Sequence, residues 1–496
     1  MPLTPNAIYE DFKNNDLDKL SAVELLQTLI DNTDNSSTRI ESLKILEKIQ
    51  VNNDKTFKFL EHLLISDTNE DVRNLTCRII RKFFLDKALA PISFVLEYES
   101  SLKCLITGVS TLVEINTDDS KSILIKKIYN FYKKQFKSNL VTILKKKKIK
   151  DFSIQELGDL LITYYIISSL KTAFGYTKYK LNNFALITEL DLSNVNRHAS
   201  SLNNLEKFLE SIFSLRNLKK IDLRFNHLTK IPEVFNNSIE YLDLSYNKIV
   251  KFPDLSNLVS LKTLNLKSNR LRVIPKTIGS LKSLEHLNLR NNMISDLASS
   301  IISLVSLKIL DLHGNKLTKI NVNINNSLEE LELGWNNFTA IPDVIKHLSS
   351  LVKLGIGGNR LKEIPEWIGS FQSLKELDLY DNNITQLPEL IGALNSLRIL
   401  NLRNNQLSHL PESFKNLKSL KKLNLSWNYF KFLPDWIGSL SSLKELNLWG
   451  NQLENLPKSI VLLSSLKILD LNFNKIDRIP PYLKDLEMRN GLIIKL

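Results

Sequence analysis

The stretch LKTLNLKSNRLRVIP, residues 261–275, decides how more than half of this 496-residue chain folds. Its leucines form a ladder closed by an asparagine, L-x-x-L-x-L-x-x-N. The ladder occurs twelve times between residues 218 and 480, and successive asparagines are 21 to 23 residues apart. A period of this size indicates repeated units that stack into a solenoid. The closing residues are Asn226, Asn247, Asn269, Asn292, Asn315, Asn336, Asn359, Asn382, Asn405, Asn428, Asn451 and Asn474.

The ladder resembles the leucine-rich repeat, in which every unit contributes one short strand. Because side chains alternate along a strand, the leucines at the fourth and sixth places should point into the core, and the residues between them should face the concave side. The asparagine is expected to turn the chain inward and to satisfy backbone groups that a buried turn would leave without partners. The ladder residues are therefore predicted to be structural.

The segment that leads from each asparagine back to the next ladder, here called the return, indicates a particular class of leucine-rich repeat. Ten repeats place a proline beside an apolar residue, and residues 364–374 read I-P-x-x-I-G-x-L-x-S-L with Phe371 in the leucine slot. This return and the period resemble the Ras-group-related class of intracellular leucine-rich-repeat proteins over about residues 218–480. The resemblance implies a non-enzymatic scaffold whose protein partner is a small GTPase or a phosphatase.

The first 180 residues are predicted to be all-helical, because apolar residues recur at spacings of three and four. Two segments match at an offset of 34 residues, with Arg39 over Arg73, and each follows a polar turn that can cap a helix. Over about residues 22–85 this resembles the HEAT repeat, in which the arginine and the acid of the turn link neighbouring repeats. A plain helical domain is the alternative. Helices are expected at 22–30, 39–49, 57–65, 72–84, 101–116, 120–138 and 153–174.

The expected fold class is an α/β leucine-rich-repeat solenoid preceded by an all-α domain, HEAT-like in part. The helical domain should cover residues 1–180 and the repeat domain residues 181–496. Terminal repeats must cover the open ends of the core and therefore differ from the rest. The repeat domain should contain an atypical first repeat at 187–215 with a helical insertion, twelve full repeats at 218–480, and a closing helix and strand at 481–496.

Composition is that of an ordinary folded protein, with 43% hydrophobic and 24% charged residues. The start of the chain lacks the pattern of a secretory signal, and the longest apolar run, residues 160–170, is too short to span a bilayer. Cys77 and Cys104 form neither a disulfide framework nor a zinc-binding pair, and both are expected to be buried core residues. The expected location is the reducing cytoplasm.

Catalytic motifs are absent from the sequence. No glycine is followed by lysine as a phosphate-binding loop requires, H-E-x-x-H and G-x-S-x-G do not occur, and the seven histidines are scattered. The sequence therefore predicts no enzyme, no metal or cofactor, and no small-molecule substrate.

Positive charge is concentrated in one segment. The chain carries a formal charge of +13, and residues 120–150 contain eleven lysines and no acid. Such a segment can dock on nucleic acid or an anionic membrane, which is the alternative function to a scaffold. A solvated face of lysine-rich helices is the competing interpretation. The densest block consists of Lys145, Lys146, Lys147, Lys148 and Lys150.

Binding residues are expected at the third, fifth, seventh and eighth places of the ladder, which the fold leaves free. The fifth place holds mostly Asn or Asp, either as a habit of this backbone or as part of a binding face. Arg290 and Arg403 at the seventh place and Asp381 at the eighth add charge. Exposed aromatic residues are typical of interface hot spots, and the seventh and eighth places hold seven: Phe225, Tyr246, Trp335, Tyr380, Trp427, Trp449 and Phe473.

Two local features add detail to this surface. Trp427 and Trp449 should lie on adjacent strands near Arg403, whereas Trp367 and Trp436, in the returns, are expected to pack. The repeat LGIGGNRL, residues 354–361, has only glycine at its free places from the fifth to the eighth, namely Gly355, Gly357 and Gly358. These glycines either leave a bare strip of backbone between Trp335 and Tyr380 for a partner side chain, or make room for Trp335 to lie flat.

Overall fold

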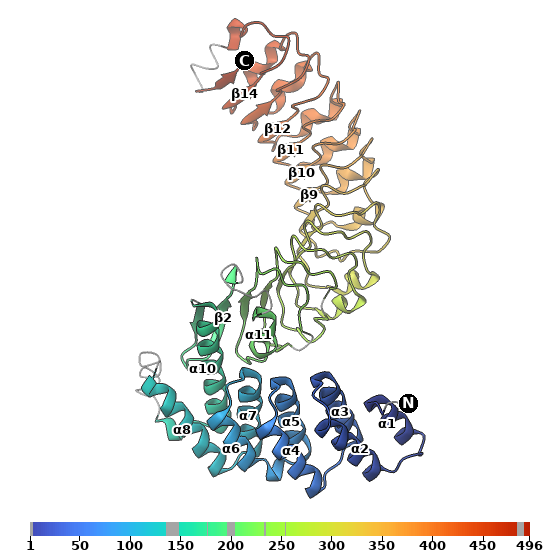
Figure 1. The fold of residues 1–496 in the computed structure, drawn as a ribbon. Coiled ribbons are helices and arrows are strands. Elements are labelled where there is room, and N and C mark those ends of the chain that lie inside the picture. The colour runs from blue at the N-terminus through green and yellow to red at the C-terminus, as the bar shows by residue number, and fades with distance from the viewer. Residues whose placement is uncertain are drawn as a thin grey trace. The chain divides into compact units, whose positions relative to one another are not determined.

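The computed structural model describes residues 3–134, 148–175, 177–195, 204–232, 235–252, 254–483 and 491–496 (Figure 1). The chain divides into two units. The first comprises Met1–Asp191 with His198–Leu218, and the second comprises Leu192–Arg197 with Lys219–Leu496. Of the expected atypical first repeat, residues 187–191 and 198–215 belong to the helical unit and residues 192–197 to the second unit.

The helical unit is built from two layers of helices (Figure 1). Helices α3, α5, α7 and α10 contact one another in succession, and α2, α4, α6 and α8 each pack against one of them. All seven expected helical segments are present as far as the structure describes them, and residues 135–138 of the expected segment 120–138 lie outside the described residues, whereas α1 and α6 were not expected. The bounds are α1 Pro5–Lys13, α2 Lys19–Asp31, α3 Ser36–Ile49, α4 Asp54–Ser66, α5 Glu70–Phe83, α6 Leu89–Tyr98, α7 Leu102–Ile115, α8 Asp118–Lys134 and α10 Ile154–Phe174, with short 3-10 turns η1 Leu85–Lys87 and η2 Ile149–Asp151.

The two matching segments, α3 and α5, begin in the same way. Asn35 and Asn69 cap them by accepting hydrogen bonds from the backbone N–H groups two and three residues later. Four residues after its cap, Arg39 forms an ion pair with Asp67 at 3.1 Å. Arg73 stands at the same place in α5, and it likewise contacts an acid in the turn that follows, Glu99, before α7 begins.

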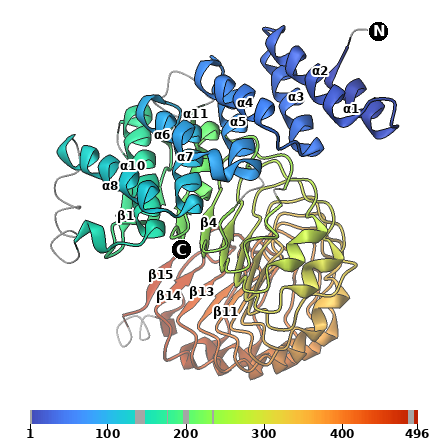
Figure 2. The same ribbon diagram turned by 90° about the horizontal axis from the view of Figure 1, so that it is seen from below.

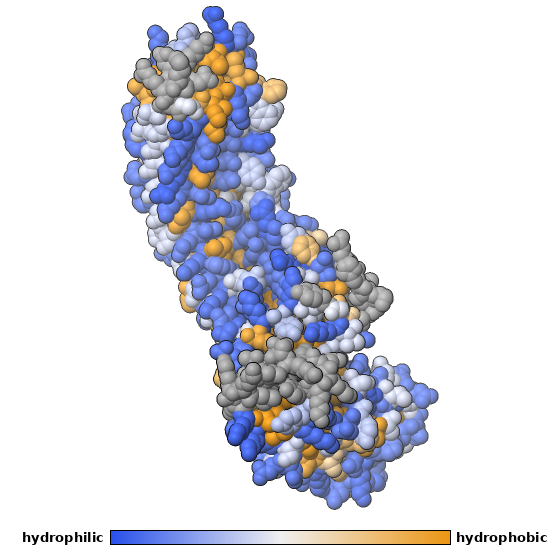
Figure 3. Space-filling model, turned by 90° about the vertical axis from the view of Figure 1, so that its left-hand side faces the viewer, coloured by the Kyte–Doolittle hydropathy of each residue, from blue (hydrophilic) through white to orange (hydrophobic). Residues whose placement is uncertain are grey.

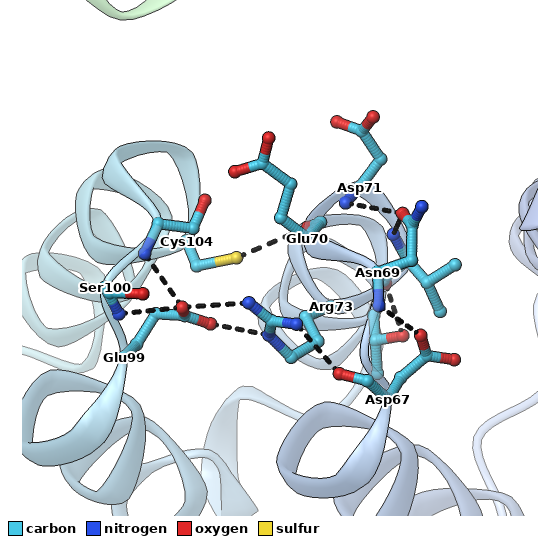
Figure 4. Close-up of polar contacts among 11 residues, drawn as sticks. Asp67, Asn69, Glu70, Asp71, Arg73, Glu99, Ser100 and Cys104 are labelled. Atoms are coloured by element: carbon cyan, nitrogen blue, oxygen red, sulfur yellow. Dashed lines mark hydrogen bonds and ion pairs between the residues drawn. The ribbon is translucent and has the colours of Figure 1, made fainter. Parts of the chain in front are cut away.

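The contacts of Arg73 link three segments of the helical unit (Figure 4). Its Nε and Nη2 donate to the two carboxylate oxygens of Glu99 at 2.7 and 3.0 Å, and its Nη1 donates to the backbone carbonyl of Asp67 at 2.8 Å. The side chains of Arg73 and Glu99 are only 16% and 7% exposed. A bidentate pair this well buried holds α5 and the start of α7 in a fixed register.

Helix α7 continues the series without the arginine. Leu105 stands four residues after its cap, Ser101, and Lys103 instead pairs with Asp71 at 3.0 Å. This is why the sequence shows no third clean copy although the structure contains the third helix pair. The two cysteines, Cys77 and Cys104, are free and fully buried, which confirms the prediction. Burial raises the pKa of the Cys104 thiol to about 12, and that of Cys77 further.

The last part of the helical unit is a hairpin and a helix. Strands β1 (Lys178–Leu181) and β2 (Ile187–Asp191) pair antiparallel, and α11 covers Asn204–Phe213. The strand at 187 and the helical insertion confirm two details of the atypical first repeat. The pairing of that strand with β1 was not expected.

The second unit is the predicted solenoid of short parallel strands, which pair in chain order and in register. Each strand covers the third to fifth places of its ladder, so equal places lie beside one another in successive repeats. The strands are β3 Lys220–Asp222, β4 Tyr241–Asp243, β5 Thr263–Asn265, β6 His286–Asn288, β7 Ile309–Asp311, β8 Glu330–Glu332, β9 Lys353–Gly355, β10 Glu376–Asp378, β11 Ile399–Asn401, β12 Lys422–Asn424, β13 Glu445–Asn447, β14 Ile468–Asp470 and β15 Ile493–Lys495.

The returns form the opposite side of this unit, and several contain a short 3-10 helix (Figure 2). The strand β15 confirms the expected last strand. Residues 481–483 are helical, and the rest of the expected closing helix, 484–490, lies outside the described residues. The return helices are η4 Lys276–Ser280, η5 Ser299–Ser303, η6 Asp343–His347, η7 Glu366–Ser370, η8 Glu389–Ala393, η9 Glu412–Asn416, η10 Asp435–Ser439 and η11 Lys458–Leu462.

The ladder asparagines are structural, as predicted, and Asn359 shows how they act. Its Nδ2 donates to the backbone carbonyls of Leu333, in the preceding repeat, and Ile356, in its own, at 3.1 and 2.9 Å. Its Oδ1 accepts from the backbone N–H of Phe338 at 3.0 Å. One buried amide thus satisfies groups in two consecutive repeats, while the ladder leucines around it fill the core.

Candidate functional site

The fifth place of the ladder serves the backbone. In ten of the twelve repeats its side-chain oxygen accepts a hydrogen bond from the N–H two residues later, at 2.9 to 3.3 Å. Only Glu332 and Gly355 depart from this pattern. Asn and Asp form this local bond readily, so the polar spine is a habit of the backbone.

The eighth place has a left-handed backbone in all twelve repeats, with φ between 50° and 69°. Glycine, asparagine and aspartate tolerate this conformation, whereas for other residues it costs roughly 1–2 kcal/mol. Five aromatic residues nevertheless occupy it: Phe225, Tyr246, Trp335, Trp427 and Phe473. Bulky residues in a strained conformation point to a functional demand at that position.

Three aromatic residues near the end of the repeats, Trp427, Trp449 and Phe473, form what we name the C-terminal aromatic cluster. The Trp427 and Trp449 rings meet edge-to-face at 5.2 Å and 73°, and Trp449 and Phe473 do so at 5.7 Å and 68°. The contact between the two tryptophans confirms that they lie on adjacent strands. Trp427 and Phe473 are 46% and 77% exposed.

Gly450, in the repeat that follows Trp427, lies against the ring of that tryptophan. A Cβ atom at Gly450 would come within 3.1 Å of the Trp427 ring, so the glycine lets that ring rest on the next repeat. Toward this end of the repeats, hydrophobic residues gather on the strand-bearing side (Figure 3). Phe473, Ile493 and Leu496, which belong to the last part of the chain, are all exposed. The result is a preassembled apolar surface.

A second aromatic pair lies at the start of the repeats. Phe225 and Tyr246 stack with their centroids 4.3 Å apart and their planes within 12°. The ammonium of Lys267 lies 5.3 Å from the Tyr246 centroid, which is a cation–π contact. Both rings are partly exposed.

Aromatic side chains cover the backbone of the repeat LGIGGNRL, residues 354–361. Trp335 donates from Nε1 to the Tyr380 hydroxyl at 2.6 Å, so the two rings join across it. The Tyr380 ring occupies the space that a Cβ at Gly357 would need, and the Trp335 ring lies 2.9 Å from the Cβ position of Gly358. The glycines therefore make room for both rings, and the interpretation as an open strip is wrong.

Charged groups surround this bridge. At Gly355, the carboxylate of Glu332 fills the vacant side-chain position and pairs with Lys353 at 3.0 Å. On the next strand, burial raises the pKa of Asp378 to about 6, against the opposing effect of the Tyr380 N–H. Burial also lowers the pKa of His313 to about 4, so this imidazole is neutral at pH 7.

The three charged candidates differ in their surroundings. Arg403 is exposed, one repeat before Trp427, and its guanidinium has no ion-pair partner among the described residues. Asp381 accepts a hydrogen bond from Asn404 Nδ2 at 2.7 Å, and Arg290 is half-buried. The guanidinium of Arg403 is thus available to a partner beside the C-terminal aromatic cluster.

The remaining predicted residues lie elsewhere. Lys145, Lys146 and Lys147 fall outside the described residues, and Lys148 and Lys150 are exposed on either side of Ile149. In the returns, Trp367 donates to the Asp343 carboxylate at 3.1 Å, and the Trp436 ring lies 6.1 Å from that of Phe414. Both tryptophans are half-buried packing residues.

Metal binding and membrane insertion are two further kinds of function to which the described residues can be compared. Over the part of the chain that the structure describes, three or more His, Cys, Asp or Glu side chains never come together in a group that could hold a metal ion. In the same residues, every helix is too short or too polar to traverse a lipid bilayer.

Sequence reasoning missed the left-handed backbone of the eighth place. A signal for it was available, because five repeats carry the residues that favour such a backbone: Gly314, Gly358, Gly450, Asn291 and Asn404. Against that background the five aromatic residues stand out as exceptions.

Comparison with known proteins identifies the repeats. A family model described as a leucine-rich repeat region matches residues 239–356 and 361–452, and the model of the single leucine-rich repeat matches 217–238, 442–463 and 465–486. An internalin of Listeria monocytogenes has the same fold, with a TM-score of 0.52 and 24% identity over 66% of this chain and 93% of that one. A leucine-rich-repeat protein of Leptospira interrogans is 29% identical over 65% of this chain and 94% of that one, with a TM-score of 0.48.

The curated relatives share only short segments. Toll-like receptor 9 of Mus musculus is 44% identical over 61 residues, which are 12% of this chain and 6% of that protein. The volume-regulated anion channel subunit LRRC8A of Homo sapiens is 36% identical over 100 residues, 19% of this chain and 11% of that protein. The chain thus spans a small part of each relative, and the matches establish leucine-rich repeats without distinguishing a class among them.

Proposed function

We propose that the leucine-rich-repeat region binds a protein partner on its concave face, and that the C-terminal aromatic cluster is the anchor. Solenoids present extended concave surfaces that are suited to binding. The proposal rests on the conformational free-energy cost of placing these aromatic residues in a left-handed backbone. Trp427 and Phe473 stand exposed in a left-handed backbone where sister repeats have Gly or Asn, and a binding anchor accounts for their retention.

The geometry of the cluster suits an anchor. Edge-to-face aromatic pairs contribute about 0.5–1.5 kcal/mol beyond the area they bury, so the rings are ordered before a partner arrives. A partner then loses less conformational entropy on binding. Arg403, exposed one repeat before Trp427, adds a group that can pair with an acid at the rim.

The finer assignment of the partner rests on the resemblance to the Ras-group-related class. It makes a small GTPase or a phosphatase the first candidates, with the chain acting as a non-enzymatic scaffold. The helical unit extends that scaffold: the ion pairs of Arg39 with Asp67 and of Arg73 with Glu99 are of the kind that the HEAT-like resemblance implies. Docking on nucleic acid or an anionic membrane through residues 120–150 stays the alternative function.

The proposal is tested by quantitative affinity capture with two matched variants. The first combines Trp427→Asn with Trp449→Ser, which introduces residues that sister repeats carry at the same places, as in Asn404 and Ser426. The control combines Tyr429→Ser with Phe432→Ser. Those rings are 53% and 55% exposed in the same repeat, but lie after its asparagine and outside the cluster.

The cluster variant should bind the partner at least about a hundredfold more weakly, because truncating one hot spot costs about 2 kcal/mol, or about thirtyfold, and two are truncated. Its melting temperature should not fall, since asparagine suits the left-handed backbone of residue 427. The control variant should capture the partner as the wild type does. Unchanged capture by the cluster variant, or an equal loss in the control, would sink the proposal.

A further inference from the structure

The second place of the ladder, immediately before each strand, carries a charge pattern that the fold does not require. In the first six repeats the sign alternates along the stack: Lys219, Glu240, Lys262, Glu285, Lys308 and Glu329. The alternation produces ion pairs between repeats, with Glu240 bound to Lys219 at 3.0 Å and to Lys262 at 2.8 Å, and Glu285 to Lys308 at 3.7 Å. Each charge in this half faces an opposite neighbour.

The pattern changes after Val352. The next five repeats carry only cations at the second place, and all five are exposed; we name them the cation row: Lys375, Arg398, Lys421, Lys444 and Lys467. Within the described residues, Lys375, Arg398, Lys421 and Lys444 have no ion-pair partner. These four cations thus lack the neutralisation that the charges at the second place have in the first half of the solenoid.

Backbone hydrogen bonds align the row. The carbonyl of Arg398 accepts from the N–H groups of Lys421 and Lys422 at 2.8 and 3.0 Å, and the carbonyl of Lys421 accepts from Lys444 and Glu445 at the same distances. Since neighbouring strands lie about 4.8 Å apart, the five residues occupy a line of about 20 Å. Like charges on neighbouring strands repel one another, so the row destabilises the solenoid.

The neighbouring third place does not cancel the row. Its residues are Glu376, Ile399, Lys422, Glu445 and Ile468, and Glu445 is already bound to Lys422 at 2.8 Å. No aromatic residue stands among them. The row is therefore a narrow line of single positive charges, and the one cation among the flanking third-place residues, Lys422, is already paired with Glu445.

We propose that the cation row docks an extended acidic segment of a polypeptide. A segment of about six residues spans the row in extended form, and its carboxylates supply the neutralisation that glutamates supply in the first half. Single-stranded nucleic acid is disfavoured because its binding sites combine cations with stacking aromatic rings, which the third place lacks. The proposal is independent of the aromatic anchor, because it uses other residues at the opposite ends of the strands.

The test restores the alternation that the first half shows. Combining Arg398→Glu with Lys444→Glu makes the second-place series read Lys, Glu, Lys, Glu, Lys from residue 375 to residue 467. A control of equal charge combines Lys316→Glu with Lys319→Glu, both exposed and outside the row. The probe is a fluorescein-labelled oligoglutamate peptide of about eight residues, long enough to cover the row. Oligouridylate and phosphatidylserine vesicles serve as competing polyanions.

Three results are expected together. The row variant should bind the peptide about tenfold or more weakly, because two attractive charges become repulsive, whereas the control should lose no more than about threefold from the change in net charge. The melting temperature of the row variant should rise, since new pairs replace repulsion. The variant with Trp427→Asn and Trp449→Ser should bind the peptide as the wild type does, which separates this inference from the proposed function.

Several outcomes would overturn the inference. Wild-type peptide affinity in the row variant would do so, as would an equal loss in the control. Tighter, row-dependent binding of oligouridylate or of the vesicles would assign the row to another class of partner. A lowered melting temperature in the row variant would mean that these cations serve the fold.

Discussion

Single residues divide the work of each repeat by place. The asparagine at the ninth place and the Asn or Asp at the fifth satisfy backbone groups, and the eighth place turns the chain through a left-handed backbone. The sequence makes the first of these tasks clear, because the ladder contains the same asparagine in every repeat. The left-handed turn was missed because aromatic residues occupy it as often as glycine or asparagine does. Residues that differ from the type their place in the ladder favours are therefore the best candidates for a function.

Asp378 allows one such task to be tested. Five sister repeats have Asn at this fifth place. Asp378 accepts a hydrogen bond from the Tyr380 N–H at 3.3 Å, and the side-chain oxygen of an asparagine can accept the same bond. Burial raises the Asp378 pKa from 3.8 to about 6 in the folded protein. Between these values the folded state holds a proton that the unfolded state has lost, so stability falls as the pH rises through this window.

Asp378→Asn should therefore raise the free energy of unfolding at pH 7 by about 1–3 kcal/mol. The difference from the wild type should shrink as the pH falls and vanish below about pH 4. Urea unfolding of both proteins across this range measures it. A variant that is less stable than the wild type at pH 7 would contradict the account.

At the scale of elements, the sequence predicted the helices that show a strong apolar period and missed α1 and α6. Helix α6 contains Pro91 in its first turn, where the missing N–H has no helical partner in any case. A proline in the first turn is compatible with a helix, but a proline in the sequence usually indicates that a helix ends, so α6 was not predicted. The third helix pair went unrecognised for a related reason, because Leu105 replaces the arginine that marks α3 and α5.

The Arg73 contacts test what joins the helices. Arg73→Ala removes a bidentate pair with Glu99 and leaves that carboxylate buried, which should lower the free energy of unfolding by about 2–4 kcal/mol. Lys82→Ala is the matched control, because its ion pair with Glu47 is single and more exposed, with the two side chains 55% and 23% exposed, and should be worth less than about 1 kcal/mol. Chemical unfolding followed by circular dichroism measures both. Equal losses would show that the Arg73 contacts do not join the elements.

Across the whole molecule, periodicity predicted the solenoid and placed the candidate residues on one face of its strands. It could not predict how those residues meet, because contacts between repeats depend on backbone conformation and side-chain direction. The bridge from Trp335 to Tyr380 and the edge-to-face cluster are of this kind. The cation row was not predicted, because binding residues were expected only at the third, fifth, seventh and eighth places and the row occupies the second. Both proposed surfaces draw on the last five repeats, so binding should concentrate in that half of the solenoid.

The most direct test of the central claim is site-specific photo-crosslinking in cells. The photoreactive residue p-benzoylphenylalanine replaces Phe473, in the C-terminal aromatic cluster, or Phe432, exposed outside it. If the cluster contacts a protein partner, position 473 should give a protein adduct that disappears when Trp427→Asn and Trp449→Ser are added, and position 432 should give none. Absence of an adduct at 473, or an adduct at 432 alone, would contradict the claim that the cluster contacts a protein partner.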